Sequence, residues 1–298
     1  MNLTYHDGVR RSTEMRSGDA SGPACPPFSD CHLPNPTRRG LEIPHPVRYS
    51  RPKGRGVQAA GSGKIHALRR THQRGTGALR MNAEKQPVSL MIFDLDGTLI
   101  RSGDDIAASV NYTLDALSQP PIEREKILRF IGDGVRVLIE RSLGPTAREL
   151  VPKALELFST HYADHMLDTT DLYPDVHPVL THFARQNKVI VTNKPVGAAR
   201  AIVDRLQIRG YFTEIIGADT TPHRKPDTGV LAPLFEGVAP DPKRTLVVGD
   251  GVNDILLARN AGFISCALLN GLSDREDLLA LEPDHACERL SELVDLFA

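Results

Sequence analysis

The sequence predicts an α/β protein whose core is a mainly parallel sheet, with a helical domain inserted after the first strand. Three observations support this fold class. Apolar runs rich in β-forming residues occur at residues 88–93, 188–191 and 246–249, which is typical of buried strands. Segments with helical periodicity lie between these runs, as parallel strands require. The 298 residues are enough for one such domain and a second, smaller one.

The first predicted strand, residues 88–93, ends in the sequence Asp-Leu-Asp-Gly-Thr-Leu at residues 94–99. Residues two apart on an extended chain point the same way, so Asp94 and Asp96 can face one pocket. Open α/β sheets bind ligands at this end of their strands. Two carboxylates held so close favour a hard divalent cation such as Mg²⁺ between them. The alternative is a solvated Asp-x-Asp-Gly turn.

The segment between the first two strands, residues 102–178, is predicted to be helical. The first helix is expected to be capped by Asp104, to carry apolar residues three or four apart, and to end at Pro120. Further helices are indicated around residues 127–131, 135–139 and 150–162. The turns between them contain Gly132-Asp133-Gly134 and Gly144-Pro145.

The rest of the chain returns to the core. Helices are expected over residues 177–186, 197–206 and 250–261, and strands at 215–217 and 263–268. Polar residues again follow the strands. The Thr192 hydroxyl and the adjacent backbone N–H can bind a phosphate oxygen, and Asp250 and Asp254 can share one helix face. Lys225, in a Pro-flanked loop, can neutralise a phosphoryl group. Each has a structural alternative. Thr192 can simply begin a helix, Asp250 and Asp254 can be acids that complement a helix N-terminus, and Lys225 can be a solvated surface lysine.

Four of these segments, in this order, resemble the motifs of the haloacid dehalogenase-like superfamily of phosphohydrolases. They are residues 94–99, Val-Ile-Val-Thr-Asn-Lys at 189–194, Lys-Pro-Asp at 225–227, and Leu-Val-Val-Gly-Asp-Gly-Val-Asn-Asp at 246–254. Within the superfamily the chain is most similar to the phosphoglycolate phosphatase group, from about Pro87 to the C-terminus. The third motif departs from the usual Lys-Pro-x-Pro, because Asp227-Thr228 follows Pro226.

The resemblance implies a Rossmann-like core formed by residues 85–101 and 179–298, and a helical cap formed by residues 102–178. A cap closes over the site and excludes water from a reactive phosphoryl group. Gly132, Asp133 and Gly134 resemble the cap loop that faces the active site, where glycines let backbone N–H groups approach a small anion. The alternative is a glycine that ends a helix. Arg136 is not predicted as a site residue, because an arginine one turn into a helix commonly faces solvent.

The resemblance also implies a reaction: hydrolysis of a phosphate monoester through an aspartyl-phosphate intermediate, with 2-phosphoglycolate as the substrate. Asp94 would be the nucleophile and Asp96 the general acid and base. Mg²⁺ would be held by Asp94, the backbone carbonyl of Asp96 and Asp250, with Asp254 a direct or an indirect ligand. Thr192, the Asn193 backbone and Lys225 would bind the phosphate oxygens.

Other activities of the superfamily stay open at this stage. The second aspartate, Asp96, disfavours haloacid dehalogenases and phosphonoacetaldehyde hydrolases. It does not separate a phosphoglycolate phosphatase from a phosphatase for pyrophosphate, a nucleotide monophosphate or a sugar phosphate. A β-phosphoglucomutase-like isomerase, which also needs the second aspartate, is a further alternative.

The N-terminal region differs from the rest in charge and composition. Residues 1–80 carry a net charge of +9 and the remaining residues −10, within a formal total of −1. Many Pro, Gly, Ser and Arg residues, without a period of 2 or 3.6, predict that residues 1–84 are a disordered basic tail. We expect translation to begin at Met81. The alternatives are a disordered tail that is translated, or a segment for targeting or nucleic-acid binding.

Composition also indicates compartment and partners. No apolar run approaches the ~20 residues needed to span a bilayer, so no membrane partner is expected. Four cysteines show neither metal-type spacing nor an evident disulfide framework, which favours a reduced, cytoplasmic setting. We expect a monomer or homodimer that acts on a small phosphorylated metabolite. A nucleic-acid-binding protein that uses the basic tail is the non-catalytic alternative, and the complete set of four motifs argues against it.

Overall fold

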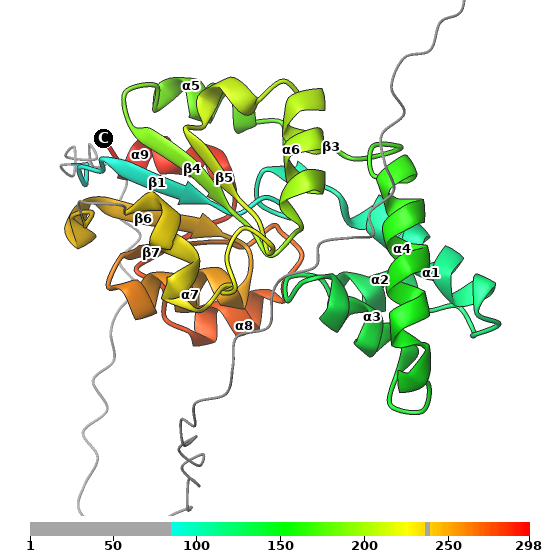
Figure 1. Ribbon diagram of the computed structural model, residues 1–298. Helices are drawn as coiled ribbons and strands as arrows, with labels where there is room; N and C mark the ends of the chain where they lie inside the picture. Colours follow the sequence, from blue (N-terminus) through cyan, green and yellow to red (C-terminus); the bar gives the residue numbers. More distant parts are fainter. Residues whose placement is uncertain (1–84, 236–238) are drawn as a thin grey trace, which may run out of the picture. The chain divides into compact units, whose positions relative to one another are not determined.

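The core of the protein is a six-stranded sheet in which every neighbouring pair of strands is parallel (Figure 1). The computed structural model describes residues 85–235 and 239–298. The strand order is β5-β4-β1-β6-β7-β8. The strands are β1 Leu90–Phe93, β4 Asn187–Val191, β5 Glu214–Ile216, β6 Thr245–Gly249, β7 Ile264–Leu268 and β8 His285–Cys287. The predicted fold class is therefore confirmed, while the predictions for residues 1–84, including the start at Met81, lie outside the described residues.

Register places the polar strand ends together. Phe93, the last residue of β1, pairs with Ile190 of β4 on one side and with Val248 of β6 on the other. The residues that follow these strands, Asp94, Thr192 and Asp250, therefore meet at one edge of the sheet. This is the carboxyl edge, where parallel α/β sheets bind ligands.

Helices cover both faces of the sheet, because alternate residues of each strand are buried on opposite sides. Met91 and Phe93 belong to the apolar cluster that contains helices α5, α6 and α9, and Leu90 and Ile92 belong to the cluster that contains α7. These helices are α5 Val176–His182, α6 Val196–Arg205, α7 Val252–Ala261 and α9 Leu293–Leu296, and α8 Arg275–Ala280 packs beside α7. Short 3₁₀ turns lie at Arg148–Leu150, Arg209–Tyr211, Thr228–Leu234, Pro242–Arg244 and Leu290–Glu292.

Four helices between β1 and β4 pack around an apolar cluster of their own (Figure 1). They are α1 Gly103–Ala116, α2 Arg124–Leu128, α3 Val135–Leu143 and α4 Val151–His165. We refer to these helices and their connecting loops as the cap. None of the helices in the described part of the chain has the length and hydropathy needed to span a membrane.

Three details of the predicted helices were wrong. Asp104 does not cap α1, because the helix begins at Gly103 and Asp104 instead pairs with Arg124, 2.5 Å away. The N-cap residue Ser102 makes no capping bond, since its hydroxyl donates to Asp96. The first helix ends at Ala116 rather than at the prolines, and α5 ends at His182 rather than at Gln186.

A short antiparallel pair of strands, not predicted from the sequence, joins the cap to the core. It consists of β2 Ile100–Arg101 and β3 Asp171–Leu172. Beside it, the buried carboxylate of Asp105 in α1 accepts hydrogen bonds from the backbone and hydroxyl groups of Thr169 and Thr170, at 2.6–3.1 Å. Burial tends to raise the pKa of Asp105, but these hydrogen bonds lower it below its usual value. Asp105 thus ties the entry of the cap to its exit.

Candidate active site

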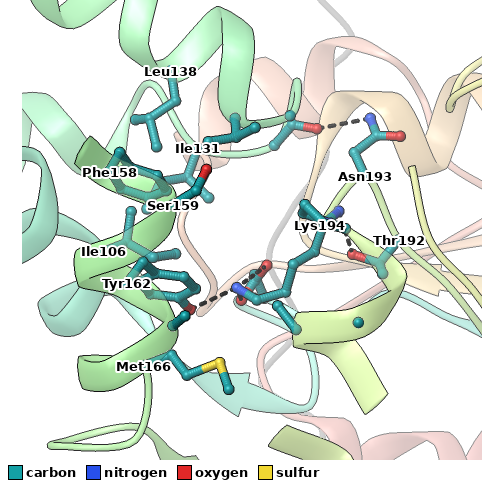
Figure 2. A pocket seen from close by; sticks show the side chains of 18 of the residues that line it. Ile106, Ile131, Leu138, Phe158, Ser159, Tyr162, Met166, Thr192, Asn193 and Lys194 are labelled. Carbon is teal, nitrogen blue, oxygen red and sulfur yellow. Dashed lines mark hydrogen bonds and ion pairs between the residues drawn. The ribbon is translucent and has the colours of Figure 1, made fainter. Parts of the chain in front are cut away.

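A cavity of about 390 Å³ lies between the carboxyl edge of the sheet and the cap (Figure 2). Asp94, Asp96, Thr192, Asn193 and Lys194 line it from the core. The cap contributes mainly apolar side chains, together with the hydroxyl groups of Ser159 and Tyr162 and the backbone of the Gly132–Gly134 loop. The sequence-predicted residues at the ends of β1 and β4 therefore share one cavity.

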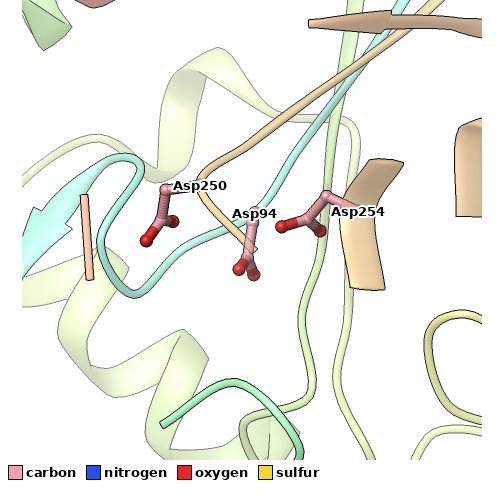
Figure 3. A group of neighbouring side chains, drawn as sticks. All are labelled: Asp94, Asp250 and Asp254. Carbon is pink, nitrogen blue, oxygen red and sulfur yellow. The ribbon is translucent and has the colours of Figure 1, made fainter. Parts of the chain in front are cut away.

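Three buried aspartates form a compact acidic cluster beside the cavity (Figure 3). One carboxylate oxygen from each of Asp94, Asp250 and Asp254 lies within 4.8 Å of the other two. Burial, and then the charge of Asp94, raises the pKa of Asp250 to about 8. Burial also raises the pKa of Asp254, although the charge of Lys225 opposes the shift. Three carboxylates this close repel one another unless a cation lies between them.

The donor set of the acidic cluster fits a hard divalent cation. All its ligand atoms are carboxylate oxygens, which Mg²⁺ prefers. Asp94 Oδ1 is buried and accepts no hydrogen bond within the described residues, although Lys225 Nζ lies 2.8 Å away. Lys225 offers one positive charge to a cluster of three carboxylates, so a further cation beside them would reduce their mutual repulsion. The Asp96 carboxylate is not a member of the acidic cluster, and the sequence prediction for Asp96 concerns its backbone carbonyl.

The turn after β1 and the loop after β7 hold Asp250 in place. Thr98 Oγ1 donates to Asp250 Oδ1 at 2.7 Å, and the backbone N–H of Leu272 donates to Oδ2 at 2.7 Å. Gly97 has a φ of +84°, and a Cβ atom there would collide with the Asp250 carboxylate. The Gly-Thr pair that follows Asp96 is therefore required both for the backbone turn and for the close approach to Asp250.

Lys225 supplies positive charge to the acidic cluster. Its side chain is buried, and Nζ donates to Asp254 Oδ1 at 2.7 Å while lying 2.8 Å from Asp94 Oδ1. Burial alone would lower the pKa of Lys225, but the charges of Asp254 and Asp94 raise it well above its usual value. The alternative of a solvated surface lysine is therefore wrong.

Asp96 has different partners from Asp94. Its carboxylate accepts hydrogen bonds from Lys194 Nζ, at 3.0 and 3.1 Å, and from Ser102 Oγ, at 2.5 Å. Lys194 Nζ also donates to the Tyr162 hydroxyl of α4 in the cap, at 2.7 Å (Figure 2). The roles of Lys194, Tyr162 and Ser102 in the site were not predicted from the sequence. The position of Lys194, two residues after Thr192, was the one signal that could have indicated it.

Thr192 and Asn193 follow β4 and line the cavity, as predicted, but their side chains make different contacts. The Thr192 hydroxyl accepts a hydrogen bond from the Lys194 backbone N–H at 3.2 Å and lines the cavity. The Asn193 side chain donates to the Lys225 carbonyl and accepts from the Lys225 backbone N–H. It also donates to the Gly132 carbonyl of the cap at 2.9 Å. The Asn193 side chain is therefore occupied by structural contacts, and its backbone is the part available to a phosphate.

The cap loop Gly132–Gly134 lies over the strand ends. Asn253, at the start of α7, donates to the Gly132 carbonyl at 3.2 Å and to Asp133 Oδ1 at 2.7 Å. Both glycines have positive φ and line the cavity, whereas the Asp133 carboxylate is engaged with Asn253 and with Arg141, 2.6 Å away. Helix α2 ends at Leu128, so neither glycine is its C-cap and that alternative is wrong.

Known proteins share both the sequence pattern and the fold. The family model described as haloacid dehalogenase-like hydrolase matches residues 91–268. The phosphoglycolate phosphatase of Vibrio parahaemolyticus is 35% identical over 223 residues, which is 72% of this chain and 98% of the relative. The phosphoglycolate phosphatase 1 of Pseudomonas aeruginosa is 35% identical over 214 residues, 69% of this chain and 78% of the relative.

A solved structure agrees with these matches. The crystal structure of a predicted phosphoglycolate phosphatase from Haemophilus somnus superposes with a TM-score of 0.65 at 27% identity, covering 70% of this chain and 96% of that one. The match spans almost the whole of the relatives in Vibrio and Haemophilus, so the core and the cap are both included. The chain therefore belongs to the haloacid dehalogenase-like hydrolase family.

Proposed function

We propose that the protein is a phosphatase that hydrolyses small phosphate monoesters, with 2-phosphoglycolate as the preferred substrate, to give glycolate and phosphate. The observation that carries the proposal is the contrast between two carboxylates on one cavity. Asp94 lies in the acidic cluster beside Lys225, whereas Asp96, two residues on, is held by Lys194 and Ser102. Two carboxyl groups in different environments suit two different roles in one reaction. The named substrate of the relatives supports the choice of 2-phosphoglycolate.

The reaction proceeds in two steps on the chain's own residues. An oxygen of the Asp94 carboxylate attacks phosphorus, and the bond from phosphorus to the leaving oxygen breaks while Asp96 gives that oxygen a proton. The product of this step is an aspartyl phosphate on Asp94 and a free alcohol. Asp96, now a carboxylate, then takes a proton from water as the water attacks phosphorus, which releases phosphate and restores Asp94.

Binding of the phosphoryl oxygens follows from the residues around Asp94. The Thr192 hydroxyl and the Asn193 backbone N–H would donate to these oxygens, and the Lys225 ammonium, 2.8 Å from Asp94, would offset their charge. Asp94, the Asp96 carbonyl and Asp250 would hold Mg²⁺, and the membership of Asp254 in the acidic cluster supports a place for it as a ligand or next to one. When bound, the ion would orient the phosphate and neutralise charge between the anions.

A panel of small phosphomonoesters tests the proposal. The purified protein is assayed with Mg²⁺ and with EDTA on 2-phosphoglycolate, p-nitrophenyl phosphate, a nucleoside monophosphate, a hexose phosphate and pyrophosphate. We expect the highest kcat/KM for 2-phosphoglycolate and loss of turnover in EDTA. A protein that hydrolyses none of these compounds with Mg²⁺ would refute the proposed function, and a higher kcat/KM for another member would change the substrate.

A further inference from the structure

We propose that Lys194 and Tyr162 form a binding subsite for a carboxylate on the leaving group, so that the protein selects phosphomonoesters whose leaving group is anionic. This inference rests on the proposed function, since it takes Asp96 as the group that protonates the leaving oxygen. It adds a specificity-determining residue from the core and one from the cap.

Distance supports the subsite. Lys194 Nζ lies 3.0 and 3.1 Å from the two oxygens of Asp96 and 2.7 Å from the Tyr162 hydroxyl (Figure 2). In 2-phosphoglycolate one methylene group separates the leaving oxygen from the carboxylate. A leaving oxygen that contacts Asp96 therefore brings its carboxylate within reach of the groups that surround Asp96. Lys194 and Tyr162 are two of those groups, and both can donate a hydrogen bond to a carboxylate.

The lining of the cavity leaves few other places for an anion. Lys194 is the only basic residue among the described residues that line it, and the cap side is mostly apolar, with Ile106, Leu138 and Phe158. Burying a carboxylate against apolar side chains without a cation is costly. Arg136 does not line this cavity, and its side chain is 60% exposed and lies 3.8 Å from Glu140.

The charge around Lys194 gives the same result. The buried Lys194 ammonium is paired with the Asp96 carboxylate, and the two side chains are 5% and 12% exposed. Because both are largely shielded from solvent, a further carboxylate beside this ammonium would be attracted to it with little screening. A neutral leaving group of the same shape would gain less from this contact.

A matched pair of substrates isolates the subsite. The first is 2-phosphoglycolate and the second is its amide, the phosphate ester of glycolamide, which has nearly the same shape without the negative charge. The measured quantity is the selectivity, defined as kcat/KM for 2-phosphoglycolate divided by kcat/KM for the amide. We expect wild-type selectivity well above one. Lys194→Met is expected to lower it by about 10- to 100-fold, the effect of a hydrogen bond to a charged group.

Two further variants complete the design. Tyr162→Phe keeps the ammonium and removes one neutral hydrogen bond, so we expect a selectivity loss of about 2- to 10-fold. Lys188→Met is the matched control, because Lys188 is also a buried lysine but donates only to the backbone carbonyls of Phe183 and Gln186. The control is expected to keep the wild-type selectivity whatever its effect on stability.

Several results would overturn the proposal. If Lys194→Met slows both substrates equally, Lys194 acts only by holding Asp96. Arg224 lies next to the cap loop, because its Nη1 is 3.4 Å from the position that a Cβ atom on Gly134 would occupy. If Arg224→Met lowers selectivity and Lys194→Met does not, the carboxylate of the substrate binds at the cap loop instead. If Lys194→Met does not fold, two other results would refute the subsite. One is a wild-type selectivity near one, and the other is a Tyr162→Phe variant with the selectivity of the wild type. A wild-type protein that hydrolyses neither substrate nor any phosphomonoester would instead refute the proposed function.

Discussion

Replacing Asp250 by asparagine is expected to stabilise the metal-free protein and to weaken its response to Mg²⁺. Burial and the charge of Asp94 raise the pKa of Asp250 from 3.8 to about 8. Between these pH values the folded state holds a proton that the unfolded state has released. Stability of the metal-free protein therefore falls as pH rises through this window, and asparagine removes the dependence.

The magnitude follows from the same numbers. At pH 7 the shift costs the wild type about 4 kcal/mol of unfolding free energy. Asp250 accepts hydrogen bonds from Thr98 Oγ1 and the Leu272 N–H. Asparagine can keep the bond from Leu272 and donate to Thr98 Oγ1, at a loss of about 1 kcal/mol. The variant should thus be more stable by about 3 kcal/mol at pH 7 and by less than about 1 kcal/mol at pH 5.

Urea unfolding in EDTA at pH 7 and pH 5 measures the difference. Asp115→Asn is the control, because Asp115 is exposed on α1, and it should change stability by less than about 0.5 kcal/mol. Adding Mg²⁺ at 100 times its Kd should stabilise the wild type by about 2.7 kcal/mol and the Asp250→Asn variant by less. A variant that is less stable than the wild type in EDTA at pH 7, or a stability difference independent of pH, would show that the pKa of Asp250 is not raised in the folded protein.

Three further predictions concern other parts of the site and the cap. Asp94→Asn should lower kcat by at least about 10³-fold with a much smaller change in KM, and near-normal turnover in steady-state assays would contradict the role of Asp94. Gly97→Ala should lower the free energy of unfolding by about 1–3 kcal/mol, because φ is +84° and Cβ meets the Asp250 carboxylate; an unchanged urea midpoint would count against this. Asp105→Asn should cost about 1–3 kcal/mol at pH 7 through lost hydrogen bonds from Thr169 and Thr170. Because these bonds lower the pKa of Asp105, that cost should shrink as pH falls below 3.8, the usual pKa of an aspartate, and a constant stability difference in acid would argue against it.

Local pattern was enough to predict five of the six strands of the sheet, and the acidic residues at its edge. Apolar runs such as Leu90–Phe93 and Thr245–Gly249 are buried on both faces, which produces a strong signal in a single sequence. Because parallel strands end at the same edge of the sheet, the positions of Asp94 and Asp250 could be inferred from the strands that they follow. Residues whose placement depends only on a nearby strand end were therefore predictable.

Contacts between the cap and the core were not predictable in the same way. Lys194 and Tyr162 are 32 residues apart, and their hydrogen bond depends on how α4 lies against the strand ends. The strands β2 and β3 have two residues each, too few for a periodic signal. The Asp104 error has a similar cause, since the tertiary contact of Ser102 with Asp96 replaced a local cap.

Cys266 and Cys287 form a contact within the core that was also not predictable from the sequence. Their spacing in the sequence indicated no disulfide framework, and both are free thiols, but their Sγ atoms lie 3.6 Å apart because β7 and β8 are neighbours. Strand β8 was absent from the predicted elements, so the contact could not be inferred. Whether two cysteines lie close together depends on the order of the strands in the sheet, which their spacing along the chain does not contain.

The stereochemistry at phosphorus distinguishes a covalent stage on Asp94 from direct attack by water. The substrate is 2-phosphoglycolate made chiral at phosphorus with oxygen isotopes and sulfur, hydrolysed by the wild-type protein in isotopically labelled water. Each in-line displacement inverts phosphorus. Two displacements, first by Asp94 and then by water, predict net retention of configuration in the product. Net inversion would mean that water attacks the substrate directly and that no aspartyl phosphate forms on Asp94.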